Sequence, residues 1–275
     1  MTALTDSQPV EPGRLVADWP VKLPIFGVEV SATTCEELAD AILRAARERR
    51  RACVTALAVH GLITATDDPE FRHMLQAFQA LAPDGQPVRF ALNVLHGAGM
   101  PDRVRAVDLT LEVCGRAATE RLKIYLLGSR PDVVRSLRTE LLRRFKDLEV
   151  VGCEPGVYRP LTASENAALI ERVNTSGAGL LLIGLGCPHQ EAFAYRHRND
   201  FNAVQMCVGS AFDIVSGTKL NAPMWVQRAG FEWLFRLVQE PRRLWRRYLV
   251  TNSRFIVKFL FTLIERRASR RPPTH

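Results

Sequence analysis

Three glycine-containing turns follow predicted strands, and they are the first places where this sequence can do chemistry. The turns are Gly128-Ser129 after KIYLL, the stretch from Gly184 to Pro188 after LLLI, and the stretch from Gly209 to Asp213 after VQMCV. Glycine lets the backbone approach a ligand closely, and the helix after each turn points unpaired N–H groups at an anion. One such turn is typical of any strand-to-helix connection, but three together favour a ligand such as a sugar nucleotide, held at Gly128, Gly184, Gly186 and Gly209.

Two further segments carry polar side chains next to predicted turns. Asp84 stands between Pro and Gly in LAPDGQPV, where an aspartate usually accepts hydrogen bonds from its own backbone; the alternative is a carboxylate presented to a ligand. Gln190 and Glu191 begin the helix after the second glycine turn. Glu191 suits the positive end of that helix, and Gln190 can donate to a sugar hydroxyl. We expect the neighbouring His189 at the surface.

Several kinds of site are excluded by spacing. The chain has no GxGxxG and no GxxxxGK[ST], so a dinucleotide fold or a P-loop has little support. No two aspartates stand two residues apart, and the histidines are not spaced as ligands, so we expect neither a metal nor another cofactor. The six cysteines lie far apart without a CxxC pair, which predicts reduced and mostly buried thiols.

Strand and helix patterns alternate along most of the chain. The pattern predicts strands at 21–30, 52–59, 121–128, 148–153, 179–186 and 203–209, and helices at 38–50, 68–81, 131–145, 165–174 and 188–198. The first helix has Thr33 or Thr34 as its cap. Short apolar strands separated by helices predict an α/β fold, a mostly parallel Rossmann-like sheet with helices on both faces. Ligands of such sheets bind at the carboxyl ends of the strands.

The chain divides into three predicted regions. Residues 1–20 read as a flexible lead-in, residues 21–231 as the α/β domain, and residues 232–275 as a helical appendage without strand signals. The first residues have neither a basic start nor an apolar core, so we expect no secretory signal and a cytosolic location.

The charge of the chain is concentrated in its last part. Of a net charge of +8, the residues from Arg228 onward supply twelve Arg and Lys against three acids, so residues 1–227 are nearly neutral. A basic tail of this kind binds phosphates, whether of nucleic acid, an anionic membrane or a phosphorylated ligand.

Arginines and aromatic residues alternate in this tail. That mixture is typical of a helix that lies in a membrane interface, with its apolar side in the acyl boundary. The stretch FIVKFLFTLI is too short to span a bilayer. The alternatives are a helix packed on the domain with a solvated basic face, and a nucleic-acid binder, although no known motif for one is present. Away from a membrane the apolar side can pack on a second copy, which would make a homo-oligomer.

Several of these segments, taken in order, resemble one family of enzymes. PDGQPV, RV…DL, LLGS, GLGCPHQEAF, VGSAFDIVSG and GFEWLFRL are similar to the motifs of the WecG/TagA/CpsF family of bacterial glycosyltransferases. The resemblance covers the chain from about Val21 to Tyr248. It replaces the turn interpretation of Asp84.

The resemblance implies a metal-independent, inverting transferase at the cytoplasmic face of the membrane. Such enzymes move a hexose, an N-acetylhexosamine or its uronic acid from a UDP-sugar to a polyprenyl-diphosphate-linked saccharide. The products feed exopolysaccharide, capsule or teichoic acid-like polymers. We therefore expect a UDP-sugar, a lipid-linked acceptor and the membrane surface as partners, and no nucleic acid.

The same resemblance implies roles for individual residues. Asp84 corresponds to the proposed general base. The side chains implied to bind substrate, the last four through the donor diphosphate, are Thr55, Arg103, Gln190, Asp213, Arg236, Arg243, Arg246 and Arg247.

Three departures from the family pattern affect these expectations. The family's TxN element keeps Thr55 but lacks its asparagine, so we expect a sugar pocket unlike that of N-acetylmannosamine enzymes. Ala106 replaces a glycine, and Asn221 replaces the arginine of an RAP triplet, which alters nucleotide or acceptor contacts. A different nucleotide-using α/β enzyme and a non-catalytic membrane- or nucleic-acid-binding protein remain as alternatives.

Overall fold

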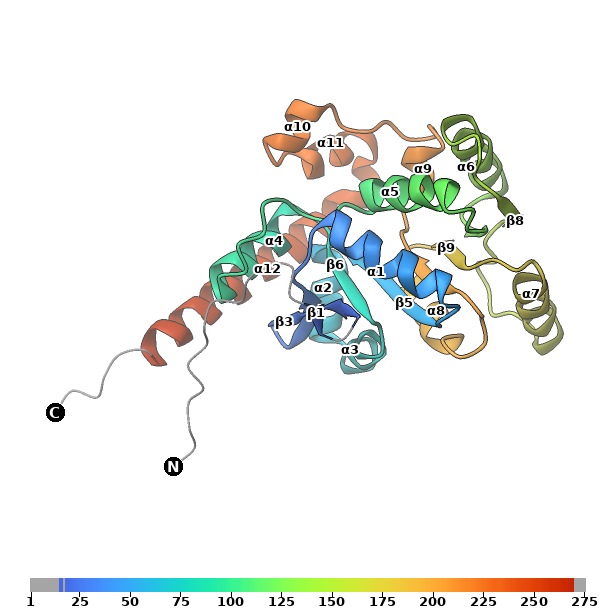
Figure 1. Ribbon diagram of the computed structural model, residues 1–275. Helices are drawn as coiled ribbons and strands as arrows, with labels where there is room; N and C mark the ends of the chain where they lie inside the picture. The colour runs from blue at the N-terminus through green and yellow to red at the C-terminus, as the bar shows by residue number, and fades with distance from the viewer. Residues whose placement is uncertain (1–14, 17, 270–275) are drawn as a thin grey trace.

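A six-stranded parallel sheet forms the centre of the computed structural model, which describes residues 15–16 and 18–269 (Figure 1). The strand order is β6-β5-β10-β9-β7-β8, and every pair in the sheet is parallel. In chain order the strands are β5 (Ala52–Leu57), β6 (Ala80–Pro83), β7 (Ile124–Gly128), β8 (Val150–Glu154), β9 (Leu180–Gly184) and β10 (Val204–Cys207). The predicted α/β class with a parallel sheet is confirmed.

Helices cover both faces of this sheet, because successive strand residues point to opposite sides. In β9, Leu180 and Leu182 join one buried cluster, whereas Leu181 and Ile183 join the other. The first cluster is closed by α1 (Cys35–Arg47), α5 (Ala106–Thr119), α6 (Pro131–Arg144) and α9 (Ala211–Val215). The second is closed by the β3–β4 hairpin (Lys22–Ile25 and Val28–Ser31), α2 (Val59–Asp67), α3 (Pro69–Gln76), α4 (Gln86–His96), α7 (Ala163–Thr175) and α8 (His189–Arg196).

Helix starts follow the capping signals in the sequence. Thr34 accepts a hydrogen bond from the backbone of Glu37, whose side chain accepts one from the Thr34 backbone. Thr162 and Glu165 form the same reciprocal pair at α7. Each pair satisfies backbone donors that a helix end leaves free, which is why the expected start of α1 is confirmed.

Two expected elements differ from the structure. The predicted strand at 21–30 is the β3–β4 hairpin, which reverses at Phe26 and Gly27, both with positive φ. The predicted helix at 68–81 ends at Gln76, and its last residues belong to strand β6, which pairs with β5. A short apolar run such as QALAP looks the same as a helix end and as a buried strand, and only its partner strand decides between them.

The predicted flexible segment 1–20 lies mostly outside the described residues. Within the described part, β1 (Leu15–Val16) pairs with β2 (Trp19–Pro20) in a small antiparallel ladder. All six cysteines are free thiols, three of them fully buried.

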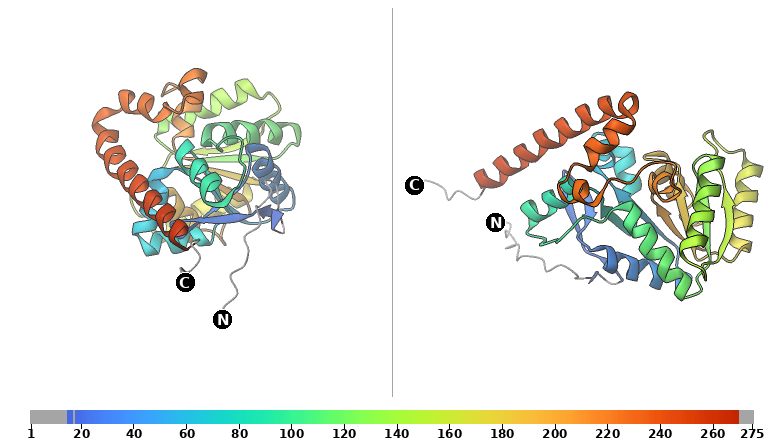
Figure 2. Two further views of the ribbon diagram at one scale, coloured as in Figure 1. Left: turned by 90° about the vertical axis from the view of Figure 1, so that its left-hand side faces the viewer. Right: turned by 90° about the horizontal axis from the view of Figure 1, so that it is seen from above.

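The C-terminal part is helical, as the sequence predicts. It consists of α10 (Met224–Arg228), α11 (Glu232–Gln239) and the long α12 (Pro241–Ser269), which runs along one side of the domain (Figure 2). Phe255 and Phe259 are buried against the domain, where they contact Phe26 and Phe90. None of the described helices combines the length and hydropathy that a membrane span requires.

Candidate active site

The carboxyl ends of the strands and the C-terminal helices enclose a cavity of about 910 Å³. Its floor is made by the turns after β5, β6, β7, β9 and β10, and its other walls by α11 and α12. Parallel strands place all their carboxyl ends at one edge, so turns far apart in sequence meet there. Of the residues expected to act on substrate, ten line this cavity: Asp84, Arg103, Gly184, Gly186, Gln190, Gly209, Asp213, Arg236, Arg243 and Arg247.

Asp84 directly follows β6, and its carboxylate is half-buried in the cavity wall. Its backbone N–H donates to the carbonyl oxygens of Leu57 (3.2 Å) and Ala82 (2.9 Å). The next residue, Gly85, has a φ of +108°, a conformation that side chains strongly disfavour. The backbone therefore fixes the position of the carboxylate, which accepts no hydrogen bond from the described residues.

The surroundings of Asp84 contain charges of both signs. Burial raises the pKa of its carboxyl above the ordinary value, and the nearby Glu232 carboxylate acts in the same direction. Arg236, Arg103 and Arg105 oppose this effect without cancelling it. A carboxylate with a raised pKa is a better proton acceptor near neutral pH than an exposed one.

The glycines of the three turns do not all line the cavity, and Gly128 acts instead through close packing. Gly128 packs so tightly that a Cβ there would lie 2.8 Å from backbone atoms of Gly184. Gly128 itself does not line the cavity, but the adjacent Ser129 does. The structure thus gives Gly128 a packing role beneath the site, and its expected contact with substrate stays a prediction.

Thr55 and Gln190 belong to a buried hydrogen-bond cluster below the second turn. Thr55 is fully buried and outside the cavity lining, and its hydroxyl donates to Glu191 Oε1 (2.7 Å). Gln190 Nε2 donates to the same oxygen (2.8 Å), and Gln190 Oε1 accepts from the N–H of Gly186 (3.2 Å). The Thr55 hydroxyl is thus held by a carboxyl beneath the cavity, and its expected role in substrate binding stays a prediction. Two residues on, Leu57 presents an apolar surface to the cavity.

Glu191 is itself a buried carboxyl without a cationic partner among the described residues. Burial raises its pKa, and the hydrogen bonds from Gln190 and Thr55 only partly oppose that. Its second oxygen, Oε2, has no hydrogen-bond partner within the described chain. Glu191 therefore organises the second turn from beneath, rather than only favouring the positive end of α8.

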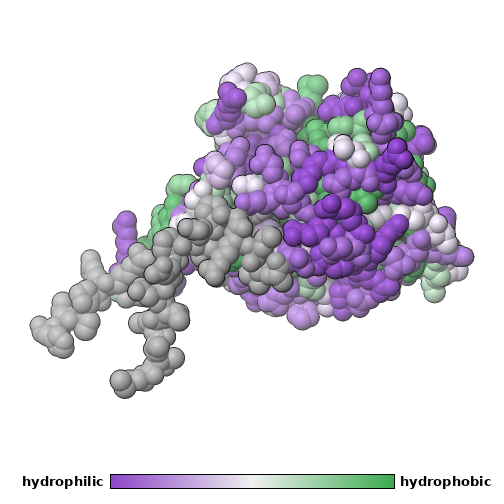
Figure 3. Space-filling model, in the orientation of Figure 1, coloured by the Kyte–Doolittle hydropathy of each residue, from purple (hydrophilic) through white to green (hydrophobic). Residues whose placement is uncertain are grey.

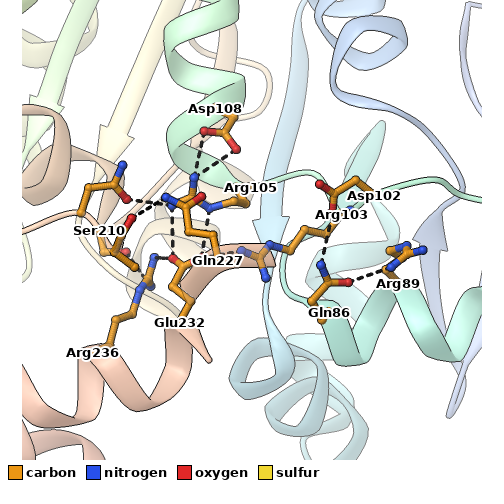
Figure 4. A network of polar contacts seen from close by, with 12 residues as sticks. Gln86, Arg89, Asp102, Arg103, Arg105, Asp108, Ser210, Gln227, Glu232 and Arg236 are labelled. Atoms are coloured by element: carbon orange, nitrogen blue, oxygen red, sulfur yellow. Dashed lines mark hydrogen bonds and ion pairs between the residues drawn. The ribbon is translucent and has the colours of Figure 1, made fainter. Parts of the chain in front are cut away.

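Three arginines converge on the carboxylate of Glu232 at the start of α11 (Figure 4). Glu232 Oε2 lies 2.6 Å from Arg103 Nη2 and 3.1 Å from Arg105 Nε, and Oε1 lies 2.8 Å from Arg236 Nη2. Burial would raise the pKa of Glu232, but the three arginines together hold it below its usual value. Arg236 also donates to Ser210 Oγ (3.3 Å), which joins α11 to the third glycine turn.

Asn221, one of the three departures from the family pattern, contacts this cluster from outside the cavity. Its side-chain oxygen accepts a hydrogen bond from Arg105 Nη2 (2.9 Å), and Asp108 binds Arg105 Nη1 (3.0 Å). An arginine at position 221 would put a second guanidinium beside that of Arg105. The departure thus changes how the C-terminal helices are held, not the lining of the cavity.

The remaining charged residues of the site separate into paired and unpaired groups. Lys219 Nζ lies 3.5 Å from Asp213 and 3.4 Å from Glu240, and Glu240 also binds Arg243 (2.5 Å). Arg247 lines the cavity without an acidic partner among the described residues.

Arg246, which was expected to bind the diphosphate, lies outside the cavity lining. It is exposed and stacks over the ring of Trp245, with its guanidinium carbon 5.6 Å from the ring centroid. One residue along a helix corresponds to a rotation of about 100°, so Arg246 and Arg247 cannot face the same side. Of these two neighbours, Arg247 lines the cavity and Arg246 does not.

Sequence reasoning missed several residues of the cavity. His60, at the start of α2, lines it, and burial together with Arg247 lowers the pKa of this imidazole to about 4. Lys219, Tyr158 and Glu232 line it as well. Glu232 stands in the GFEW segment already noted, but it was counted only among the few acids of a basic tail.

Cationic side chains outnumber acidic ones around the cavity. Arginine and lysine contribute Arg103, Arg130, Lys219, Arg236, Arg243 and Arg247, and the acids are Asp84, Asp213, Glu232 and Glu240. The excess of two positive charges suits a ligand with about two negative charges, such as a diphosphate. In the part of the chain that the structure describes, no three His, Cys, Asp or Glu side chains are grouped to hold a metal ion.

The comparison with known protein families agrees with this geometry. The model of the glycosyl transferase WecG/TagA/CpsF family matches residues 23–269, which is nearly the whole chain and includes every wall of the cavity. This match sets aside the alternatives of a different nucleotide-using enzyme and of a non-catalytic binding protein. The chain belongs to the WecG/TagA/CpsF family of glycosyltransferases.

Proposed function

We propose that this glycosyltransferase moves a sugar from a UDP-sugar to a saccharide carried on a polyprenyl diphosphate. The observation that carries the proposal is the arrangement around Asp84: a carboxylate with a raised pKa opens into a cavity with an excess of arginines. A base and a diphosphate-binding group are the two components that transfer from a nucleotide sugar requires. The product belongs to a cell-surface polysaccharide of the exopolysaccharide, capsule or teichoic acid type.

The proposed reaction is a single displacement with inversion at the anomeric carbon. The acceptor hydroxyl oxygen forms a bond to that carbon while the bond to the β-phosphate oxygen of UDP breaks. The electron pair of the breaking bond stays on UDP, and the hydroxyl proton passes to Asp84. One carboxylate suffices for this reaction, because no covalent enzyme intermediate forms.

The negative charge that develops on UDP needs compensation, and arginines are suited to supply it. A guanidinium binds two phosphate oxygens at once, which an ammonium group cannot do. Arg236, Arg243 and Arg247 line the cavity from the two C-terminal helices. With this compensation from the protein, we expect UDP release to be unchanged by EDTA; loss of activity in EDTA and its return with Mg²⁺ or Mn²⁺ would contradict this assignment.

We further propose that α12 lies on the membrane and holds the enzyme at its lipid-linked acceptor. Its inner face packs on the domain through Leu244, Phe255 and Phe259. Its outer face carries both exposed arginines, among them Arg246 and Arg254, and exposed apolar side chains, which are Trp245, Leu249, Val250, Ile256, Val257, Leu260, Phe261 and Ile264. Figure 3 shows hydrophobic surface at the left edge, where α4 and α12 run together. This mixture of apolar and cationic side chains on one exposed face supports an interfacial helix, with the apolar groups in the acyl boundary and the arginines at the lipid phosphates.

Replacing Leu249, Ile256 and Leu260 together with serine should release the protein from membranes. These side chains lie on the exposed face, so the substitutions remove apolar insertion without opening the core. We expect at least a tenfold weaker partition onto vesicles that contain anionic lipid, measured by flotation. Val157→Ser, on the loop after β8, is the matched exposed control and should bind as wild type. If the triple variant still floats with vesicles but no longer self-associates, the face is an interface between two copies instead.

The donor and acceptor classes are tested by direct assay. A panel of UDP-hexoses, UDP-N-acetylhexosamines and UDP-uronic acids is incubated with a polyprenyl-diphosphate monosaccharide, and free UDP is measured. We expect release of UDP that depends on the acceptor with at least one member of the panel. Release from none of them, with TDP- or GDP-sugars turned over instead, would refute the UDP assignment.

A further inference from the structure

In the described part of the chain, Glu232 is the only acidic side chain in contact with three arginines, two of which line the cavity. The arginines come from separate segments: Arg103 from the loop after α4, Arg105 from the start of α5, and Arg236 from α11 itself. Arg103 and Arg105 precede Glu232 by 129 and 127 residues. One carboxylate thus joins the C-terminal helices to the loop next to Asp84.

The three arginines do not have the same surroundings. Arg105 is buried, does not line the cavity, and is bound on every side by Glu232, Asp108 and Asn221. It therefore anchors Glu232 to the α/β domain. Arg103 and Arg236 do line the cavity, and both act electrostatically on Asp84. Figure 4 shows their guanidinium groups converging on Glu232 from two sides.

The position of these two guanidinium groups depends on the carboxylate between them. Three cations gathered in a largely buried place repel one another strongly, since the dielectric screening there is weak. Glu232 is only 12% exposed, and its short contacts with all three offset that repulsion. Without the carboxylate, Arg103 and Arg236 would move apart, away from the positions that flank Asp84.

We propose that Glu232 is a positioning residue for sugar transfer: it holds Arg103 and Arg236 in the cavity wall, where both act electrostatically on Asp84. The inference rests on the proposed function and deepens it, because the arrangement of the side chains around the reaction then depends on a carboxylate that touches no reacting atom. It also implies that α11 must pack on the domain for Arg103 and Arg236 to be held in place.

If Glu232 positions the arginines, neutralising it leaves the affinity for UDP unchanged or higher. If Glu232 instead contributes to UDP binding, neutralising it lowers that affinity. The carboxylate of Glu232 lines the same cavity as the diphosphate-binding arginines, so its charge repels a diphosphate. Removing that charge also frees Arg103 and Arg236 to pair with the diphosphate, so UDP binding is kept or strengthened, whereas the loss of their fixed places near Asp84 slows the chemical step. Turnover and affinity therefore change in different directions.

The test is Glu232→Gln in the full-length protein, with kcat measured by UDP release and the Kd of UDP by calorimetry. We expect kcat to fall about 10- to 100-fold, as misplacement of groups around a reaction centre by ~1 Å does. The Kd of UDP stays equal or decreases. Glu232→Asp, which keeps the charge on a shorter side chain, recovers part of the lost turnover. Glu140→Gln is the matched control, because Glu140 also binds two arginines (Arg143 and Arg144) but on the exposed face of α6.

Two results would overturn the proposal. Wild-type kcat in Glu232→Gln would show that the arginines keep their places without the carboxylate. A fall in kcat together with an equal rise in the Kd of UDP and a lower melting temperature would show a general structural role. Failure of the proposed function is distinguishable, because it appears in the wild-type enzyme as absence of UDP release, whereas this inference depends on the ratio of variant to wild type.

Discussion

Replacing Asp84 with asparagine lowers the rate of sugar transfer by about 10² to 10⁴, the usual contribution of a positioned general base. The amide has the shape of the carboxylate but cannot accept the proton of the acceptor hydroxyl. UDP binds at least as tightly as to the wild type, because the cations of the cavity remain in place and one negative charge is removed. The measurement is single-turnover formation of product together with the Kd of UDP.

The pH dependence of the wild-type enzyme provides a second readout of the same carboxylate. The base works only when ionised, and burial raises the pKa of Asp84 above the ordinary 3.8 of an aspartate. The rate of transfer should therefore decline on acidification at a pH above that value. In Asp84→Asn the residual rate should lose this acidic decline, since the titrating group is gone.

The same substitution should stabilise the fold at neutral pH. The folded state binds the Asp84 proton more tightly than the unfolded chain does, so ionisation of this group costs stability above the folded-state pKa. That cost disappears as the pH falls through the raised pKa. Asp84→Asn should melt at a higher temperature than wild type at pH 7, and the difference should shrink towards acid.

Asp40→Asn is the control for these measurements. Asp40 is an exposed residue of α1 that pairs with Arg116, and neither residue lines the cavity. It should leave the transfer rate and its pH profile unchanged. If Asp84→Asn were folded and as fast as the wild type, another group would have to take the proton, and the assignment of the base would be wrong.

The sheet was predictable because its signals are local. Each apolar strand and each capped helix is encoded within about ten residues, and a parallel sheet brings the ends of its strands to one edge whatever their order. Gln190 and Asp213, which follow predicted strands, could therefore be placed at the site from the sequence, whereas Asp84 was assigned to it only through the family resemblance. The errors lay where the pattern is ambiguous, as at β6, which looked like the end of the preceding helix.

The electrostatic core of the site was not predictable in the same way. The contact between Glu232 and Arg103 joins residues 129 positions apart and depends on how α11 packs on the domain. Nothing in the local sequence distinguishes this glutamate from other acids of the tail. Similarly, the resemblance pointed to Thr55 as a contact, but only the structure reveals the buried Glu191 that holds its hydroxyl.

Loss of the Arg247 guanidinium should produce the second large defect. Arg247 is the cavity cation with no acidic partner among the described residues, so its charge is available to a ligand. Removing one preorganised donor to a developing charge costs about 10²- to 10³-fold in rate. We expect Arg247→Ala to lower kcat/KM for the UDP-sugar by such a factor, measured with saturating acceptor.

A structural readout in the same variant confirms that the arginine faces the cavity. Arg247 is one of the two causes that lower the pKa of His60 to about 4, the larger being burial. In Arg247→Ala the pKa of His60 should rise, which NMR titration of the imidazole detects without any substrate. The neighbouring Arg246→Ala should change neither the His60 titration nor kcat/KM for the donor by more than about threefold, because Arg246 stacks on Trp245 outside the cavity. If the two alanine variants behaved alike, the arginines would act through the overall charge of α12, and the assignment of Arg247 to the site would fail.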